Sequence, residues 1–138
     1  MAEQDIRDIA RRYVEEVVNQ GNMGLLDDLV SPDVVFHIPV AQHGLLRGIE
    51  ALRSFREEVR AAFPDFHFTV ASMITQGEEV SWHGTAAGSQ RKEFAGISPM
   101  GKHTSFMVGE FLRIIDGKIV EGWVFYDTQS ARQQLGAT

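Results

Sequence analysis

An acidic residue, Asp127, ends an apolar segment near the C-terminus. The segment Ile119 to Asp127 is rich in Val, Ile, Trp, Phe and Tyr, which predicts a β-strand. Side chains alternate between the two faces of a strand, so Trp123 and Phe125 are expected on the face of Asp127. Apolar surroundings raise the pKa of a carboxyl group, which suits it to proton transfer near neutral pH. Asp127 is therefore a candidate general acid/base, and the alternative is that it caps the helix that follows.

Glu110 lies in a second predicted strand, Lys102 to Ile115, in which its neighbours on the same face are apolar: Phe106, Val108, Leu112 and Ile114. A two-residue turn at Asp116-Gly117 would pair Ile115 with Lys118, and counting back pairs Glu110 with Trp123 and Phe106 with Asp127. The two carboxylates then share one face, about 13 Å apart along the strand. This arrangement predicts a pocket wall with two catalytic carboxyl groups and with substrate-binding aromatic residues, namely Phe106, Trp123 and Phe125.

The five histidines do not have the spacing of a metal site. There is no HExxH pair, and no other pair of histidines has the short helical spacing of a zinc site. We therefore predict no metal. His37 and His83 alternate with apolar strand neighbours, so each could line a cavity, His83 as a catalytic group and His37 as a substrate-binding group. Either could equally be a surface histidine. The remaining three are His43, His67 and His103.

Composition narrows the class of protein. The 138 residues are 43% hydrophobic and 23% charged, and the net charge is −6, which disfavours binding to nucleic acid or anionic membranes. The absence of cysteine excludes disulfides and thiolate chemistry. No apolar run approaches the roughly 20 residues of a membrane span, and the first residues do not resemble a signal peptide. We therefore expect a cytoplasmic protein. The sequence contains neither a glycine-rich cofactor-binding loop nor the G-x-S-x-G motif of a serine nucleophile.

Helical periodicity dominates the first half of the chain and strand patterns the second. This order predicts a single α+β domain over residues 1–138, with helices packed on one face of a curved antiparallel sheet. The expected helices are Glu3 to Gln20, Met23 to Val30, Ile49 to Phe63 and Thr128 to Leu135. The expected strands are Asp33 to Pro39, Phe66 to Thr75, Val80 to Gly88, Lys102 to Ile115 and Lys118 to Asp127, with an irregular stretch from Ser89 to Gly101.

The sheet is expected to be apolar on both faces. Its second face would carry Met107, Phe111, Val120, Val124 and Tyr126. The few predicted helices can cover only one face, so we expect the outer one to pair with a second copy of the chain in a homodimer.

Four segments resemble the SnoaL-like polyketide cyclase (ester cyclase) family of the nuclear transport factor 2-like superfamily. Phe94-Ala-Gly-Ile-Ser-Pro-Met-Gly101 is similar to the family's F-x-G-I-x-P-T-G loop, and the resemblance continues through Phe111 to Trp123, Asp127 and Gln134-Leu-Gly136. It extends over nearly the full chain, in the same order of elements.

The resemblance implies a cone-shaped α+β barrel of the cystatin-like kind, with helices capping a curved sheet around one apolar pocket, usually in a homodimer. It implies a metal-free and cofactor-free enzyme in which Asp127 performs acid/base chemistry in the aldol closure of a polyketide ester. Phe94 would contact the substrate. Glu110 stands where many cyclases have a histidine, and His83 where many have an arginine.

Three functions therefore remain open. The leading prediction is a cofactor-independent cyclase-like enzyme acting on an apolar polyketide-like or cyclic molecule. The second is an enzyme that isomerises its substrate or opens an epoxide with water held between Glu110 and Asp127. The third is a non-catalytic domain that binds a hydrophobic ligand or serves as a dimeric scaffold.

Overall fold

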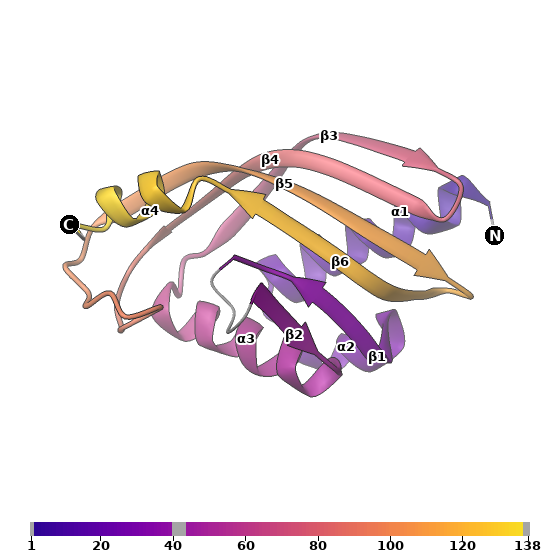
Figure 1. Cartoon of the computed structure of the whole chain (residues 1–138), viewed down its shortest axis with the longest axis horizontal. Helices are drawn as coiled ribbons and strands as arrows, with labels where there is room; N and C mark the ends of the chain where they lie inside the picture. The colour runs from indigo at the N-terminus through magenta and orange to yellow at the C-terminus, as the bar shows by residue number, and fades with distance from the viewer. Residues whose placement is uncertain (1, 40–43, 137–138) are drawn as a thin grey trace.

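A curved sheet arches over the N-terminal helices in the computed structural model, which describes residues 2–39 and 44–136 (Figure 1). His43 lies outside the described residues. The helices are α1 (Glu3–Arg12), η1 (Tyr13–Asn19, a π-helix), η2 (Met23–Leu25), α2 (Leu26–Leu29), α3 (Ile49–Ala62) and α4 (Thr128–Gln134). The strands are β1 (Val30–His37), β2 (Leu45–Arg47), β3 (His67–Gln76), β4 (Glu79–Ser89), β5 (His103–Ile115) and β6 (Lys118–Tyr126).

The six strands follow the order β2-β1-β6-β5-β4-β3, and the described sheet remains open between its two edges, β2 and β3. The α+β class and the helix-capped curved sheet are therefore confirmed. The sheet is mixed, however, because β1 runs parallel to β6 while the other neighbours are antiparallel. The short strand β2 was not expected from the sequence.

Helices α1, η1 and α3 lie on one face of the sheet and bury their apolar stripes against it (Figure 1). The first stripe follows the i, i+3, i+4 spacing of an amphipathic helix, which continues from α1 into η1. It contributes five fully buried or nearly fully buried side chains to the core: Ile6, Ala10, Tyr13, Val14 and Val17. The hydrophobic core therefore lies between the inner face of the sheet and these helices.

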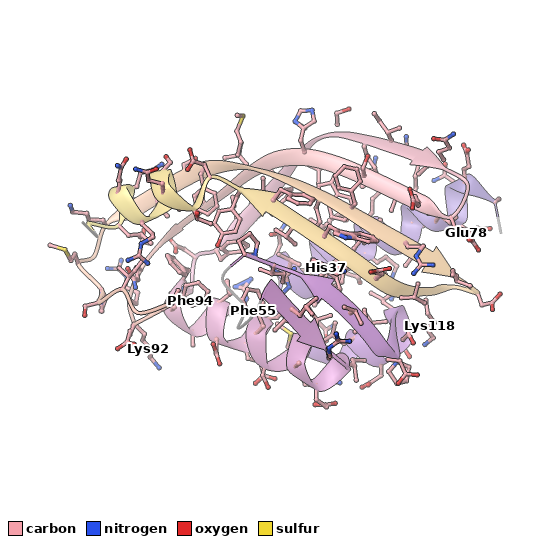
Figure 2. The ribbon with its side chains drawn as sticks, in the orientation of Figure 1. His37, Phe55, Glu78, Lys92, Phe94 and Lys118 are labelled. Atoms are coloured by element: carbon pink, nitrogen blue, oxygen red, sulfur yellow. The ribbon has the colours of Figure 1, made fainter. Side chains whose placement is uncertain are left out.

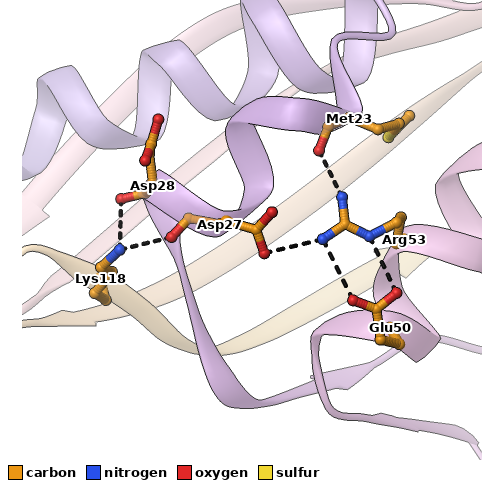
Figure 3. A network of polar contacts seen from close by, with 6 residues as sticks. All are labelled: Met23, Asp27, Asp28, Glu50, Arg53 and Lys118. Carbon is orange, nitrogen blue, oxygen red and sulfur yellow. Dashed lines mark hydrogen bonds and ion pairs between the residues drawn. The ribbon is translucent and has the colours of Figure 1, made fainter.

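A polar network fixes the position of α3 relative to α2 and β6 (Figure 3). Arg53 of α3 donates hydrogen bonds to the Met23 carbonyl at 2.8 Å and to the Asp27 carboxylate at 3.0 Å, and it pairs with Glu50 at 3.2 Å. Lys118, at the start of β6, donates to the Asp27 carbonyl at 2.7 Å. These contacts connect four elements, η2, α2, α3 and β6, at the end of the molecule opposite α4 (Figure 1).

The β5–β6 hairpin contains a bulge that changes which residues share a face. The tight turn pairs Ile115 with Lys118 as predicted, and Ile114 pairs with Ile119. Arg113 then pairs with Glu121, so Val120 has no partner on β5 and forms the bulge. Beyond Val120, every pair is shifted by one residue from the predicted register. The predicted pairing of Glu110 with Trp123 is therefore wrong.

None of the helices within the described ranges is long and apolar enough to cross a membrane.

Two strand glycines give a test of the packing. A Cβ at Gly84 of β4 would overlap the carbonyl oxygen of Thr69 on β3, whereas a Cβ at Gly109 of β5 would meet no atom within 4 Å. We expect Gly84→Ala to lower the free energy of unfolding by about 2–3 kcal/mol, since the strand backbone must move. Gly109→Ala, the matched control, should change it by less than about 1 kcal/mol. Urea denaturation measures both, and equal effects would contradict this packing.

Candidate active site

An apolar cavity of about 150 Å³ lies between α3 and the inner face of the sheet. Strands β4, β5 and β6 line one side, and α3 with Val14 and Val18 of η1 lines the other. At one end the cavity is bounded by the β4–β5 connection and by α4. Its lining is apolar apart from a small number of polar groups, of which Glu110 and Arg56 are nearly inaccessible to solvent.

The carboxyl group of Glu110 projects into this apolar cavity from the middle of β5. Glu110 is 5% exposed, and it pairs with Trp82 on β4 and with Val124 on β6. Its Oε1 atom accepts no hydrogen bond from any described residue. Burial raises the pKa of Glu110 to about 7, against the opposing effect of the nearby Arg56 charge. The carboxyl group can therefore gain or lose a proton near neutral pH.

Arg56 of α3 brings a positive charge to the same part of the cavity. Its Nη2 atom lies 3.9 Å from Glu110 Oε1, and both side chains are at most 10% exposed. Arg56 Nε donates a hydrogen bond to the Tyr13 hydroxyl at 3.0 Å, which orients the guanidinium. The distance to Glu110 exceeds that of a direct hydrogen bond, so Nη2 can also donate to a third oxygen.

Aromatic side chains form much of the remaining wall. Phe106 of β5 lies against Tyr126 of β6, with ring centroids 5.2 Å apart, and both line the cavity. Burial raises the pKa of Tyr126 to about 12, so its hydroxyl stays neutral. Phe94, from the β4–β5 connection, also lines the cavity and packs against Phe55 in the middle of α3 (Figure 2). It also packs against Phe63, directly after α3.

The β4–β5 connection is organised by one buried side chain. Gln90 is 1% exposed and donates from Nε2 to the carbonyls of Lys92 and Ile97 at 2.9 and 2.7 Å. Phe94 and Ile97 exchange backbone hydrogen bonds around a turn of two residues with positive φ. Gln90 thereby holds Phe94 and Ile97 at the cavity.

Asp127 is the N-cap of α4 and is exposed to solvent. Its carboxylate accepts a hydrogen bond from the Ser130 backbone amide at 2.9 Å, the helix-capping alternative recognised in the sequence. The next residue, Thr128, lines the cavity, whereas Asp127 does not. Asp127 is three residues beyond Val124, the partner of Glu110, so the two carboxyl groups do not share a wall.

Four predicted site residues lie on the outer face of the sheet: Trp123, Phe125, His83 and His37. The Val120 bulge places Trp123 opposite Phe111, and Phe125 opposite Gly109, away from the face of Glu110. The expectation that Trp123 and Phe125 share a face with Glu110 is corrected accordingly. His83, also opposite Gly109, is exposed.

His37 belongs to an outer polar chain. Its ring stacks on that of Trp123, with centroids 5.2 Å apart, and its Nε2 atom lies within hydrogen-bond distance of Glu121 Oε2, at 2.8 Å. Glu121 also forms an ion pair with Arg113, whose Nη2 atom lies 2.7 Å from Oε1. His37 does not line the cavity. The structure therefore brings Glu110, Phe106 and Phe94 together and leaves the other predicted site residues outside.

The predicted homodimer would use the same outer face, but Val124 and Tyr126, which were expected there, line the cavity instead because of the Val120 bulge. Met107, Phe111 and Phe125 expose 79%, 46% and 55% of their surface there. The dimer stays a prediction.

Sequence reasoning missed Arg56 and Tyr13. The signal for Arg56 was its position, four residues after Leu52 and three before Val59, within the apolar stripe predicted to face inward. A charged residue in such a stripe is a candidate for a buried pair. Tyr13 gave no such signal, because it fits the apolar stripe of its own helix.

The raised pKa of Glu110 predicts a pH-dependent stability. The folded state binds the proton more tightly than the unfolded state, so the stabilisation is present below the ordinary pKa of 4.5 and is lost as the pH rises through about 7. Between pH 5 and pH 8 the wild type should lose about 2–3 kcal/mol of unfolding free energy relative to Glu110→Gln. Urea denaturation across this range measures the difference, and parallel profiles would contradict a buried, neutral carboxyl group.

Comparisons with known proteins show which family this chain belongs to. Residues 8–135 match the family model of the SnoaL-like polyketide cyclases. IdmH of Streptomyces antibioticus, described as a candidate polyketide cyclase, is 29% identical, with a TM-score of 0.82 over 96% of this chain and 99% of its own. The comparison with curated proteins found no match.

Two more distant solved structures have the same fold. TsrD of Streptomyces laurentii is 22% identical, with a TM-score of 0.87 over 100% of this chain and 99% of its own. A candidate SnoaL-like polyketide cyclase of Jannaschia sp. CCS1 is 20% identical, with a TM-score of 0.89 over 99% of this chain and 94% of its own. At these identities the likeness concerns the fold alone. The family match supports a cyclase-like role and covers all the elements that form the cavity, so this chain belongs to the SnoaL-like polyketide cyclase family.

Proposed function

We propose that the protein catalyses an intramolecular aldol-type ring closure of a small, mostly apolar, polyketide-like molecule bound in the cavity. The observation that carries this proposal is the carboxyl group of Glu110, buried in apolar surroundings with a pKa of about 7 and 3.9 Å from the Arg56 guanidinium. An acid/base group works best when its pKa is close to the working pH. The 29% identical IdmH, a candidate polyketide cyclase, agrees with this choice of reaction.

Glu110 carries the proton in both halves of the proposed reaction. Its ionised carboxylate removes a proton from a carbon next to a carbonyl group, and an enolate forms. The enolate carbon attacks a second carbonyl of the same molecule, and one carbon–carbon bond is made. Protonated Glu110 then returns the proton to the new alkoxide. The proton balance closes within the site, so this sequence of steps uses no cofactor.

Arg56 stabilises the oxygen on which negative charge develops. Its Nη2 atom does not make a direct hydrogen bond to Glu110, and the Tyr13 hydroxyl fixes Nε from the other side. A fixed cation in an apolar cavity stabilises an enolate more strongly than water does, because it needs no reorganisation during the reaction. The apolar walls hold the flexible substrate folded, so that its reacting carbons meet.

Proton abstraction can be tested with a simple ketone. We expect the wild type to catalyse exchange of the α-protons of 2-tetralone with deuterium from the solvent, with a rate that rises with pH around 7. Glu110→Gln should lower the catalysed rate at least about 100-fold while the protein remains folded. NMR measures the exchange, and circular dichroism checks the fold. Exchange at the wild-type rate in Glu110→Gln would reject Glu110 as the base.

Asp127→Asn provides the matched control. Asparagine is as good an N-cap as aspartate, so α4 should keep its cap and exchange should stay within a few-fold of the wild type. Loss of exchange in Asp127→Asn, with exchange kept in Glu110→Gln, would return the acid/base role to Asp127.

The charge of Arg56 should set the pH at which Glu110 works. Its positive charge lowers the pKa of Glu110 against the larger effect of burial. Arg56→Met should therefore move the midpoint of the pH–rate profile upward, whereas Arg56→Lys, which keeps a cation, should move it less. The exchange rate of 2-tetralone between pH 5 and pH 9 measures both midpoints. A midpoint that is unchanged or lower in Arg56→Met would contradict the coupling of these two groups.

A further inference from the structure

The mouth of the cavity carries a cation, Arg132, that pairs with no other residue among those the structure describes. Arg132 of α4 lines the cavity and is exposed to solvent, as is Ala95 on the facing β4–β5 connection, so both mark the opening. None of the ion pairs or side-chain hydrogen bonds formed by residues 2–39 and 44–136 involves Arg132. Its guanidinium is therefore available to a bound molecule.

The end of the molecule around this mouth also differs in charge from the rest. Residues 89–105 and 127–136, which form the β4–β5 connection, the start of β5 and α4, contain four Lys or Arg and two Asp or Glu. The whole chain has a net charge of −6. Asp65, whose carboxylate accepts a hydrogen bond from the Ser89 backbone amide, adds a third acidic residue at this end. The net charge of this end is still positive. Such an asymmetry attracts anions to the opening.

The two ends of the cavity therefore present different chemistry. Glu110 and Arg56 face its interior, Phe94, Phe106 and Tyr126 line the length between, and Arg132 faces its opening. A molecule that fits all three has an enolisable carbonyl at one end, an apolar body and an anionic group at the other. Arg132 can bind a carboxylate through two parallel hydrogen bonds.

We propose that the cavity selects substrates bearing a free carboxylate, which Arg132 holds at the mouth while the reacting carbonyl lies beside Arg56 and Glu110. Arg132 is then a specificity-determining residue. This inference deepens the proposed function, since it concerns the same cavity. Its test measures binding alone. Carboxylate selection by Arg132 can therefore be rejected while the acid/base role of Glu110 is kept, and the acid/base role can be rejected while carboxylate selection is kept.

Binding of a matched acid and ester tests the proposal. The probes are 4-(2-naphthyl)butanoate and its methyl ester, which share a ring and a chain and differ in charge. An exposed ion pair contributes up to about fivefold in affinity, so the wild type should bind the acid more tightly than the ester, by up to about fivefold, as calorimetry would measure. Arg132→Gln should abolish this preference, Arg132→Lys should keep part of it, and added NaCl should weaken it.

Two further variants separate Arg132 from the other cations. Lys92→Gln removes the same charge from an exposed residue of the β4–β5 connection that does not line the cavity, so it should keep the preference (Figure 2). Arg56→Met should also keep it. Failure of the wild type to prefer the acid, or a preference unchanged in Arg132→Gln, would overturn the proposal. So would a preference lost in Arg56→Met but kept in Arg132→Gln, because the carboxylate would then bind inside the cavity.

Discussion

The burial of the Glu110 carboxyl group is the constraint on which the cavity depends. A carboxylate in an apolar site is costly unless it is paired, and here the pairing is incomplete, because Arg56 Nη2 stays 3.9 Å away. The side chain therefore keeps a proton up to about pH 7 and retains the ability to exchange it. Three elements must cooperate for this result: β5 places the carboxyl group, α3 supplies the cation, and Tyr13 of η1 holds the guanidinium. Closer pairing would stabilise the charged pair and lower the pKa of Glu110, so a poor ion pair is the better acid/base site.

Much of the fold could be predicted from the sequence because the responsible signals are local. Helical and strand periodicity, together with the turn at Asp116-Gly117, located almost every element. The parallel pairing of β1 with β6 joins residues about 90 positions apart in the chain, for example Phe36 and Gly122, and no local pattern encodes it. The ring of Phe36 occupies the space that a Cβ at Gly122 would need, so this glycine is a long-range packing requirement that looks unremarkable in the sequence.

The site was harder to predict, because one inserted residue decides which side chains face the cavity. The turn was located correctly, yet the extra residue Val120 exchanged the two faces of β6 beyond it. Trp123 and Phe125 consequently moved to the outer face, and Val124 and Tyr126 replaced them in the cavity lining. The inner placement of Glu110 did not depend on this register, since the alternation along β5 alone fixes it. Alternation within one strand therefore predicted the facing of its side chains more reliably than the assumed register between two strands did.

The position of Glu110 along its strand also explains why the cavity suits acid/base chemistry better than the strand end does. Asp127 points its carboxylate at the amide of Ser130 and remains in solvent, where it stabilises the start of α4. That helix in turn supplies Thr128, Ala131 and Arg132 to the cavity lining, and Leu135, directly after it, also lines the cavity. In the proposed function, Asp127 therefore contributes by stabilising a helix that bounds the cavity. Two carboxyl groups that look alike in the sequence thus have different surroundings: desolvation raises the pKa of Glu110 to about 7, as the proposed acid/base role requires, and the Asp127 carboxylate accepts a backbone hydrogen bond as a helix cap.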